Sequence, residues 1–196
     1  MNFQNFADKY ENLARELDTI LAEAEARITS GLPDEYFVRN VNFFTKSFLI
    51  SLCCYLEAFL KEIANSHVAL AQQRLLEAKI PRNLIGWSLK KNLPEKEMQF
   101  NQFSLNITKK EIDDELSGNP FRTANCFKLL GIDLNSIAEF NDKKEIINAV
   151  VAKRNDIIHH NDTAASISLG DIRSYSAHFI SYARTIATAA QKVNEI

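Results

Sequence analysis

The segment KRNDIIHHND, residues 153–162, gathers a guanidinium, an amide and two imidazoles where an apolar-striped stretch ends. Arginine binds phosphate oxygens through a planar fork of N–H donors and stabilises negative charge that develops on them. Histidine titrates near neutral pH, so it can carry protons to and from a nucleophile or a leaving group. Side chains four residues apart share a helical face, which pairs Asn155 with His159 and Asp156 with His160. These residue types at this spacing predict chemistry on a phosphate.

Arg154 stands on the apolar stripe of the same helix. Ile147, Val151 and Ile158 are separated by steps of four and seven, which places them on one side, and Arg154 follows Val151 by three residues. Burying an unpaired guanidinium is costly, so we expect Arg154 to have a partner or to line a cleft. The alternative is that Arg154 and His159 belong to a structural ion-pair network.

The spacing Arg154-Asn155-three residues-His159 resembles the Arg-Asn-x-x-x-His signature of HEPN domains (higher eukaryote and prokaryote nucleotide-binding). HEPN domains are all-α bundles that carry the signature late in the chain, before a last helix, and the motif here has the same place. The upstream segment SLCCYLEAFLKEI also resembles the apolar helix with a lone acid in the stand-alone toxin and phage-defence branch. The whole chain is compatible with this layout, and we expect one HEPN-like helical domain over residues 1–196.

The resemblance implies a metal-independent endoribonuclease that needs no cofactor and acts as a homodimer, with both chains contributing to a shared cleft. The 2′-OH of RNA attacks the adjacent phosphodiester and leaves a 2′,3′-cyclic phosphate and a 5′-OH, a route that DNA lacks. Carried over to this chain, Arg154 polarises the phosphate and His159 transfers the proton, while Asn155 orients His159 or the phosphate. His160 is a candidate to replace or assist His159, and Asp156 is a further assisting candidate. The implied role is in toxin–antitoxin systems or phage defence, with RNA, a second copy and an antitoxin or regulatory protein as partners.

Two other functions remain open at this stage. One is a catalytically silent HEPN-like helical dimer that binds a nucleotide or a partner protein. The other is a regulatory subunit of a larger nucleic-acid-processing complex, with the dimer cleft as a docking surface. The intact set of Arg154, Asn155 and His159 favours the ribonuclease, because a domain without catalysis has no need of it.

Glu57 interrupts the apolar run from Phe48 to Leu60. We expect Glu57 to face Arg154 and to set the orientation of its guanidinium. The alternatives are a rim residue that reaches water and, less favoured, a base that acts directly on the substrate.

The remaining polar groups give weaker signals. His159, His160 and Asp162 lack the HExxH or Cys/His spacing of a metal site, so we expect no metal. A set of lysines is a candidate RNA-facing patch, although a solvated helix face explains them more simply. The set comprises Lys143, Lys144 and Lys153, with Lys90 and Lys91.

The positioning elements follow from apolar residues at steps of three and four. They predict an all-α bundle of four to five principal helices, with an irregular insertion around 86–107 that we expect to be an extended segment or a short hairpin. Asp34, Thr108 with Glu111, and Asp142 are expected to cap helices, and Gly131 to end one. The expected helices cover 3–29, 36–78, 109–116, 120–130, 142–160 and 169–193.

Composition bounds the remaining properties. With 5 Gly and 4 Pro in 196 residues, the chain leans helical. A net charge of −2 disfavours a surface coated in Lys and Arg for duplex binding, but leaves room for a local basic patch. Cys53 and Cys54 are expected to be buried as small apolar residues rather than to form a disulfide. The run from Phe48 to Leu60 is too short to span a bilayer and no signal peptide precedes it, so we expect a cytoplasmic protein without a membrane segment.

Overall fold

The computed structural model describes residues 1–90, 98–160 and 164–195. Within these ranges every regular element is helical, and the only strand-like pairing is an isolated bridge between Pro81 and Gln102. The predicted all-α fold is confirmed. The helices are α1 (Gln4–Thr29), α2 (Glu35–Arg39), α3 (Val41–Ala78), α4 (Arg82–Ser88), α5 (Lys109–Glu115), α6 (Pro120–Leu129), a 3-10 turn (Leu134–Ser136), α7 (Ala138–His160) and α8 (Leu169–Asn194).

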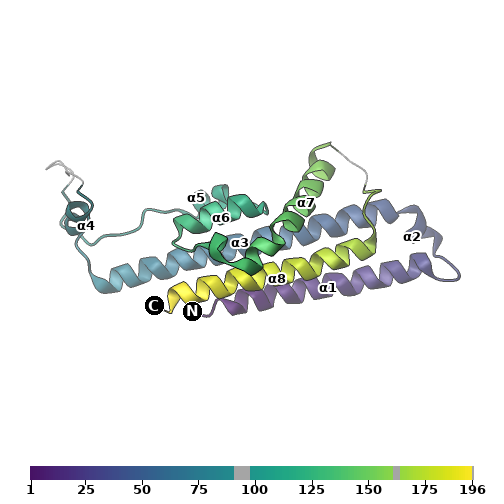
Figure 1. Cartoon of the computed structure of the whole chain (residues 1–196), viewed down its shortest axis with the longest axis horizontal. Coiled ribbons are helices and arrows are strands. Elements are labelled where there is room, and N and C mark those ends of the chain that lie inside the picture. The colour runs from purple at the N-terminus through teal and green to yellow at the C-terminus, as the bar shows by residue number, and fades with distance from the viewer. Residues whose placement is uncertain (91–97, 161–163, 196) are drawn as a thin grey trace.

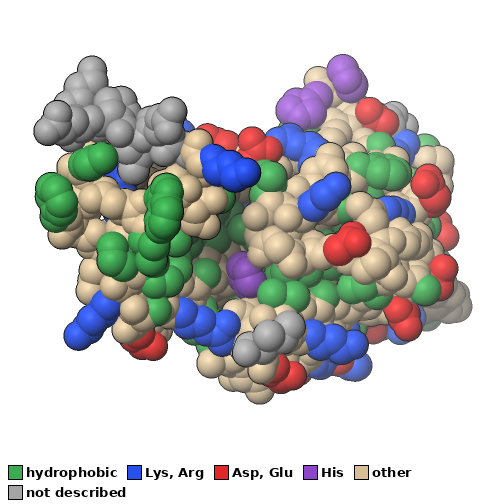
Figure 2. Space-filling model, turned by 60° about the vertical axis from the view of Figure 1, so that its left-hand side comes forward, with side chains coloured by type: hydrophobic (Ala, Val, Ile, Leu, Met, Phe, Trp, Pro, Cys, Tyr) green, Lys and Arg blue, Asp and Glu red, His purple; other side chains and the backbone are tan. Residues whose placement is uncertain are grey.

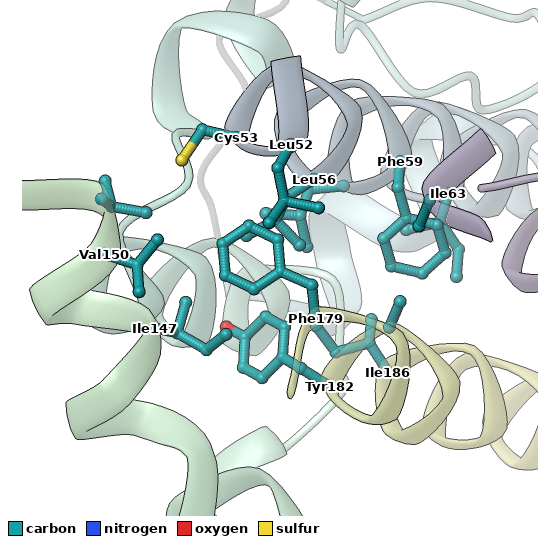
Figure 3. Packing of buried hydrophobic residues seen from close by; sticks show 14 of the residues in the cluster. Leu52, Cys53, Leu56, Phe59, Ile63, Ile147, Val150, Phe179, Tyr182 and Ile186 are labelled. Atoms are coloured by element: carbon teal, nitrogen blue, oxygen red, sulfur yellow. The ribbon is translucent and has the colours of Figure 1, made fainter. Parts of the chain in front are cut away.

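The long helices α1, α3 and α8 run side by side, and α7 crosses them at an angle (Figure 1). α8 packs against α1, α3 and α7, while α3 also contacts α1 and α7. The core runs between α1, α3, α7 and α8, and Figure 3 shows from close by the rings and branched side chains where α3, α7 and α8 meet. Phe59 and Tyr182 are fully buried there, and the Tyr182 ring stacks on that of Phe140. This packing fixes the position of α7 relative to α3.

Local hydrogen bonds fix most of the helix ends. Thr108 and Glu111 form the predicted capping box of α5, and Asp34 caps α2 by accepting from the backbone N–H of Tyr36. Gly131 ends α6 with a φ of 80°, a left-handed conformation that costs glycine little. α8 begins with a second capping box, made by Ser168 and Asp171.

Three predicted elements differ in the structure. The helix expected over 36–78 is broken at Asn40, whose side-chain amide donates to the carbonyl of Tyr36 (2.8 Å) and competes with the helical backbone. The helix expected from Asp142 begins at Ala138, because the preceding 3-10 turn leads almost directly into it. The insertion expected around 86–107 begins as a helix, since α4 runs to Ser88.

A buried histidine joins three elements at one end of the bundle. His67 of α3 lies 3.0 Å through Nε2 from the carbonyl of Leu130, and 2.9 Å through Nδ1 from the side-chain amide of Asn194. A carbonyl can only accept, so Nε2 carries the proton and Nδ1 accepts from the Asn194 amide. Burial lowers the pKa of His67; the hydrogen bond to Leu130 opposes this and the charge of Arg74 adds to it.

α3 is long and apolar enough to cross a membrane by length and composition, which no other helix in the described ranges is. Core helices of soluble proteins satisfy the same test, and Leu52, Phe59 and Ile63 are among the α3 side chains buried against the other helices. The cytoplasmic location and the absence of a membrane segment therefore stay predictions.

Candidate active site

α7 places Arg154 on its buried side, as predicted. Ile147, Val151 and Ile157 are buried, and 14% of the Arg154 side chain is exposed. The prediction that Ile158 shares this stripe is wrong, because 47% of Ile158 is exposed. The last turns of α7 project beyond the other long helices (Figure 1), so the face that carries Ile158 has no helix to pack against there.

Glu57 and Arg154 form an ion pair between α3 and α7. The Arg154 Nη2 donates to Oε1 of Glu57 over 2.8 Å, and Nη1 donates to Oδ1 of the neighbouring Asn155 over 3.0 Å. Only 23% of the Glu57 side chain is exposed, so water screens the pair weakly. The Nε of Arg154 is buried and has no hydrogen-bond partner in the described residues. The guanidinium is thus held on two sides and keeps unused donors.

The surroundings of the pair are mostly apolar. Cys53, one turn before Glu57, is buried on the side of α3 that faces α7 and Val150 (Figure 3). Burial raises the pKa of its thiol to about 12, although the nearby charge of Arg154 acts in the opposite direction. Cys53 is therefore a neutral apolar neighbour of the pair. The expectation that Cys54 is also buried is wrong, because Cys54 points to solvent from the other side of α3.

The loop before α6 passes close to the ion pair, a contact that is not predicted from the sequence. A Cβ on Gly118 would lie 3.0 Å from Cγ2 of Val151, so Val151 would have to shift, whereas its 3.6 Å to Oε1 of Glu57 is an ordinary contact. The next residue, Asn119, donates from Nδ2 to Oδ1 of Asn148 on α7 (3.0 Å) and caps α6 with its own Oδ1.

The histidines lie apart from the ion pair in a single chain. His159 and His160 are exposed at the end of α7, and within the described residues neither is hydrogen-bonded to Arg154 or Asn155. Five residues of helix separate His159 from Arg154 by about 140° of rotation and about 7.5 Å of rise. Asp156 is also exposed and forms no ion pair with His160 in the described residues. The sequence neighbours are thus divided between two faces of α7.

The candidate lysines do not form one cluster around the ion pair. Lys144 donates to Oδ1 of Asn135 and lies over the rings of Phe121 and Phe140, so it braces the start of α7. Lys143 and Lys153 are separated by about 15 Å of helix. Lys90 lies far along the chain on the insertion, and Lys91 and Asp162 lie outside the described residues.

The chemistry available here is that of a guanidinium that is mostly shielded from water, with 14% of its side chain exposed. Such a group binds an oxyanion strongly because the local dielectric is low and its position is fixed in advance. Over residues 1–90, 98–160 and 164–195, no three His, Cys, Asp or Glu side chains come together in a group that could hold a metal ion.

Comparison with known proteins identifies a family for the chain. A family model described as RiboL-PSP-HEPN matches residues 8–192, which is nearly the entire chain and includes Glu57, Gly118 and the segment from Arg154 to His160. No curated protein and no solved structure matches significantly.

Proposed function

Since the chain belongs to the RiboL-PSP-HEPN family, we propose that it is a metal-independent endoribonuclease that acts as a homodimer. Membership of a HEPN family points to nuclease or RNA-related chemistry in general. The observation that carries the finer proposal is the arginine of the family motif, which is mostly buried and held by Glu57 and Asn155, while Nη1 and Nη2 each keep a second N–H for a phosphate.

In the proposed reaction Arg154 binds the non-bridging oxygens of the scissile phosphate. Neutral His159 removes the proton from the 2′-OH as the O2′–P bond forms. The P–O5′ bond breaks, and a protonated histidine gives its proton to the departing O5′. The products are a 2′,3′-cyclic phosphate and a 5′-OH, with no water consumed. His160 is the substitute for His159 in this scheme.

The division of Arg154 and His159 between two faces of α7 supports the homodimer. One chain presents the guanidinium toward α3 and the imidazoles toward solvent, so a second α7 end alongside can complete the cleft. A two-fold axis through such a cleft brings the histidine of one chain to the arginine of the other. The proposed partners are therefore RNA and a second copy of the chain.

The proposed setting is a toxin–antitoxin system or phage defence, in the cytoplasm, with an antitoxin or regulatory protein as a further partner. A nuclease that cuts cellular RNA must be held inactive until it is needed, and a partner that covers the projecting α7 end would do so. The alternative, a silent dimer that binds a nucleotide or a protein, predicts no cleavage under any condition.

The test is cleavage of a mixed-sequence RNA in EDTA by wild type, Arg154→Ala, His159→Ala and His160→Ala. Wild type is expected to leave cyclic-phosphate ends and to spare a DNA of the same sequence. Arg154→Ala should lose roughly 100- to 1,000-fold in rate. Comparing the two histidine variants identifies the proton-transfer residue.

Arg39→Ala is the matched control, because Arg39 pairs with Glu35 in solvent (side chains 77% and 82% exposed) and should cut like wild type. Equal cleavage by all preparations indicates a contaminant. No cleavage by wild type contradicts the ribonuclease proposal and favours the silent dimer.

A further inference from the structure

The chain between α3 and α5 forms an arm that projects from the end of the bundle (Figure 1). Its described parts are residues 79–90, which include α4, and residues 98–108. Backbone hydrogen bonds join the two: Phe103 donates to the carbonyl of Ile80 (2.7 Å), and Arg82 donates to that of Asn101 (3.1 Å). The two described parts of the arm are therefore held together by backbone hydrogen bonds.

Side chains reinforce the joint. The guanidinium of Arg82 donates to Oε1 of Gln99 (2.7 Å), and the backbone N–H of Gln99 donates to Oδ1 of Asn83 (3.1 Å). Arg82 therefore keeps its full positive charge, since its partner is a neutral amide. The contacts hold the chain around Phe100 against the first turn of α4.

Large aromatic side chains stand exposed on this arm. Trp87 is 79% exposed and Phe100 is 96% exposed, which is unusual for rings of this size. Figure 2 shows hydrophobic side chains gathered on this part of the surface, with Lys and Arg side chains nearby. The other exposed apolar residues of the arm are Leu84, Leu89 and Met98.

The charge of this region is opposite to that of the whole protein. Over its described parts, 79–90 and 98–108, the arm has three Lys or Arg and no Asp or Glu, whereas the entire chain has a net charge of −2. Residues 91–97 add two Lys and two Glu, which cancel. The cations of the arm are Lys79, Arg82 and Lys90, and Lys109 and Lys110 follow at the start of α5.

We infer that the arm binds single-stranded nucleic acid, with unpaired bases stacking on Trp87 and Phe100 and the backbone phosphates lying against the cations. Aromatic faces bind any base, and nearby cations hold the backbone, which is how sequence-tolerant single-strand binding works. An apolar protein partner would bury these cations without a counter-charge, so the charge favours a polyanion. The inference rests on the proposed function only in naming RNA as the natural ligand.

Trp87 gives a direct readout, because it is the only tryptophan in the chain. Titration of the full chain with a single-stranded DNA oligonucleotide, which lacks the 2′-OH and is not cleaved, should quench its fluorescence. A DNA duplex of the same sequence should quench far less, since its bases are already stacked. Binding should weaken steeply with added salt as counterions are released.

Trp87→Ala and Phe100→Ala should each weaken binding of a labelled oligonucleotide roughly 5- to 100-fold. Phe43→Ala is the matched control, because Phe43 is also exposed (66%) but lies at the other end of α3, and it should bind like wild type. Circular dichroism checks that all variants keep their helices.

Absence of quenching, or equal binding by all variants, overturns the inference. So does a blue shift of Trp87 emission with protein concentration alone, which would mean that a second copy covers the arm. If DNA quenches the fluorescence but wild type does not cleave RNA, the binding role of the arm is supported and only the proposed function is contradicted. RNA cleavage without quenching by DNA supports the proposed function and contradicts the binding role of the arm.

Discussion

Glu57 and Arg154 depend on each other because neither charge is well hydrated. Each side chain is mostly buried (23% and 14% exposed), and the 2.8 Å bond neutralises both at once. Buried pairs of this kind add little net stability compared with apolar residues, but removing one partner leaves a charge without compensation. The pair is therefore a sensitive reporter of the site.

Glu57→Gln is expected to lower the free energy of unfolding by about 1–3 kcal/mol, since it leaves the Arg154 charge unneutralised. The double variant Glu57→Gln/Arg154→Met should recover part of this loss, because no isolated charge remains. Urea denaturation measures both. The control is Glu35→Gln in the exposed Glu35–Arg39 pair, with an expected change below about 0.5 kcal/mol. A Glu57→Gln variant as stable as that control would contradict the coupling.

His67 makes stability depend on pH. Its folded pKa lies below the ordinary value of 6.5, so the unfolded chain binds the proton more readily and stability falls as pH drops below 6.5. If Nδ1 were protonated, two N–H donors would face each other, because Nδ1 now accepts from the Asn194 amide. The positive charge of Arg74 would repel the protonated ring, and the neighbouring Phe3 ring offers no acceptor. His67→Gln should therefore lose less stability than wild type between about pH 7.5 and 5.5. Parallel pH profiles for the two proteins would refute this.

Among individual residues, the sequence predicted the contact that electrostatics requires, which is the pairing of a buried acid with a buried arginine. A lone acid and a lone arginine on apolar stripes had to be neutralised, so the contact between Glu57 and Arg154 could be expected. Ile158 was wrongly assigned because periodicity shows which face is apolar, and not where the neighbouring helices stop. Gly118 was missed because only the tertiary fold brings residue 118 within reach of residue 57.

At the scale of elements, the loop between α5 and α6 packs against the site formed by Glu57 and α7. Asn119 ties this loop to Asn148 on α7, and Gly118 allows the backbone to pass against Val151. The loop therefore restricts how far α7 and the carboxylate on α3 can move.

Gly118→Ala should lower the free energy of unfolding by about 1–3 kcal/mol, because its Cβ would press on Val151 at 3.0 Å. RNA cleavage should fall as well, because the shift of Val151 displaces α7 one turn before Arg154. Gly31→Ala is the control, since no atom lies within 4 Å of its Cβ position, and it should be neutral. Thermal denaturation and the cleavage assay check both effects; an unaffected Gly118→Ala would show that the loop yields easily.

Elements were predicted well wherever the signal was local. Capping by Asp34 and Thr108 and termination at Gly131 depend on neighbours within a few residues, and all three are confirmed. The break at Asn40 was missed because its amide competes with a backbone that an apolar pattern alone describes as helical. The helix α4 was missed because the packing of residues 99–103 helps to define it.

For the whole molecule, the family match confirms the resemblance based on Arg154, Asn155 and His159. The single domain, the homodimer and the roles of the individual residues stay predictions. Helix periodicity does not determine how a chain is divided into domains, and the fold of one copy does not determine how copies assemble or what each residue does in a reaction.

The homodimer proposal predicts complementation between two inactive proteins. Mixing Arg154→Ala with His159→Ala should restore about a quarter of wild-type cleavage, since half the dimers would be mixed and each would hold one intact site. The measurement is the cleavage rate after subunit exchange, with each variant alone as its own control. No recovery despite demonstrated exchange would contradict a cleft shared in this way.

The bond between Phe103 and Ile80 at the base of the arm bears on how such proteins diversify. The chain leaves the bundle and returns to it at neighbouring points. We therefore expect that the intervening stretch, here called the cassette, can be replaced without refolding of the bundle. Replacing residues 82–101 by a short glycine-rich turn should leave the bundle folded and RNA cleavage intact, while single-strand affinity drops. Circular dichroism, cleavage and oligonucleotide titration together test this, and an insoluble or unfolded product would show that the cassette is not separable. If the proposed function holds, exchanging the cassette alone would give the same helical core a new nucleic-acid target.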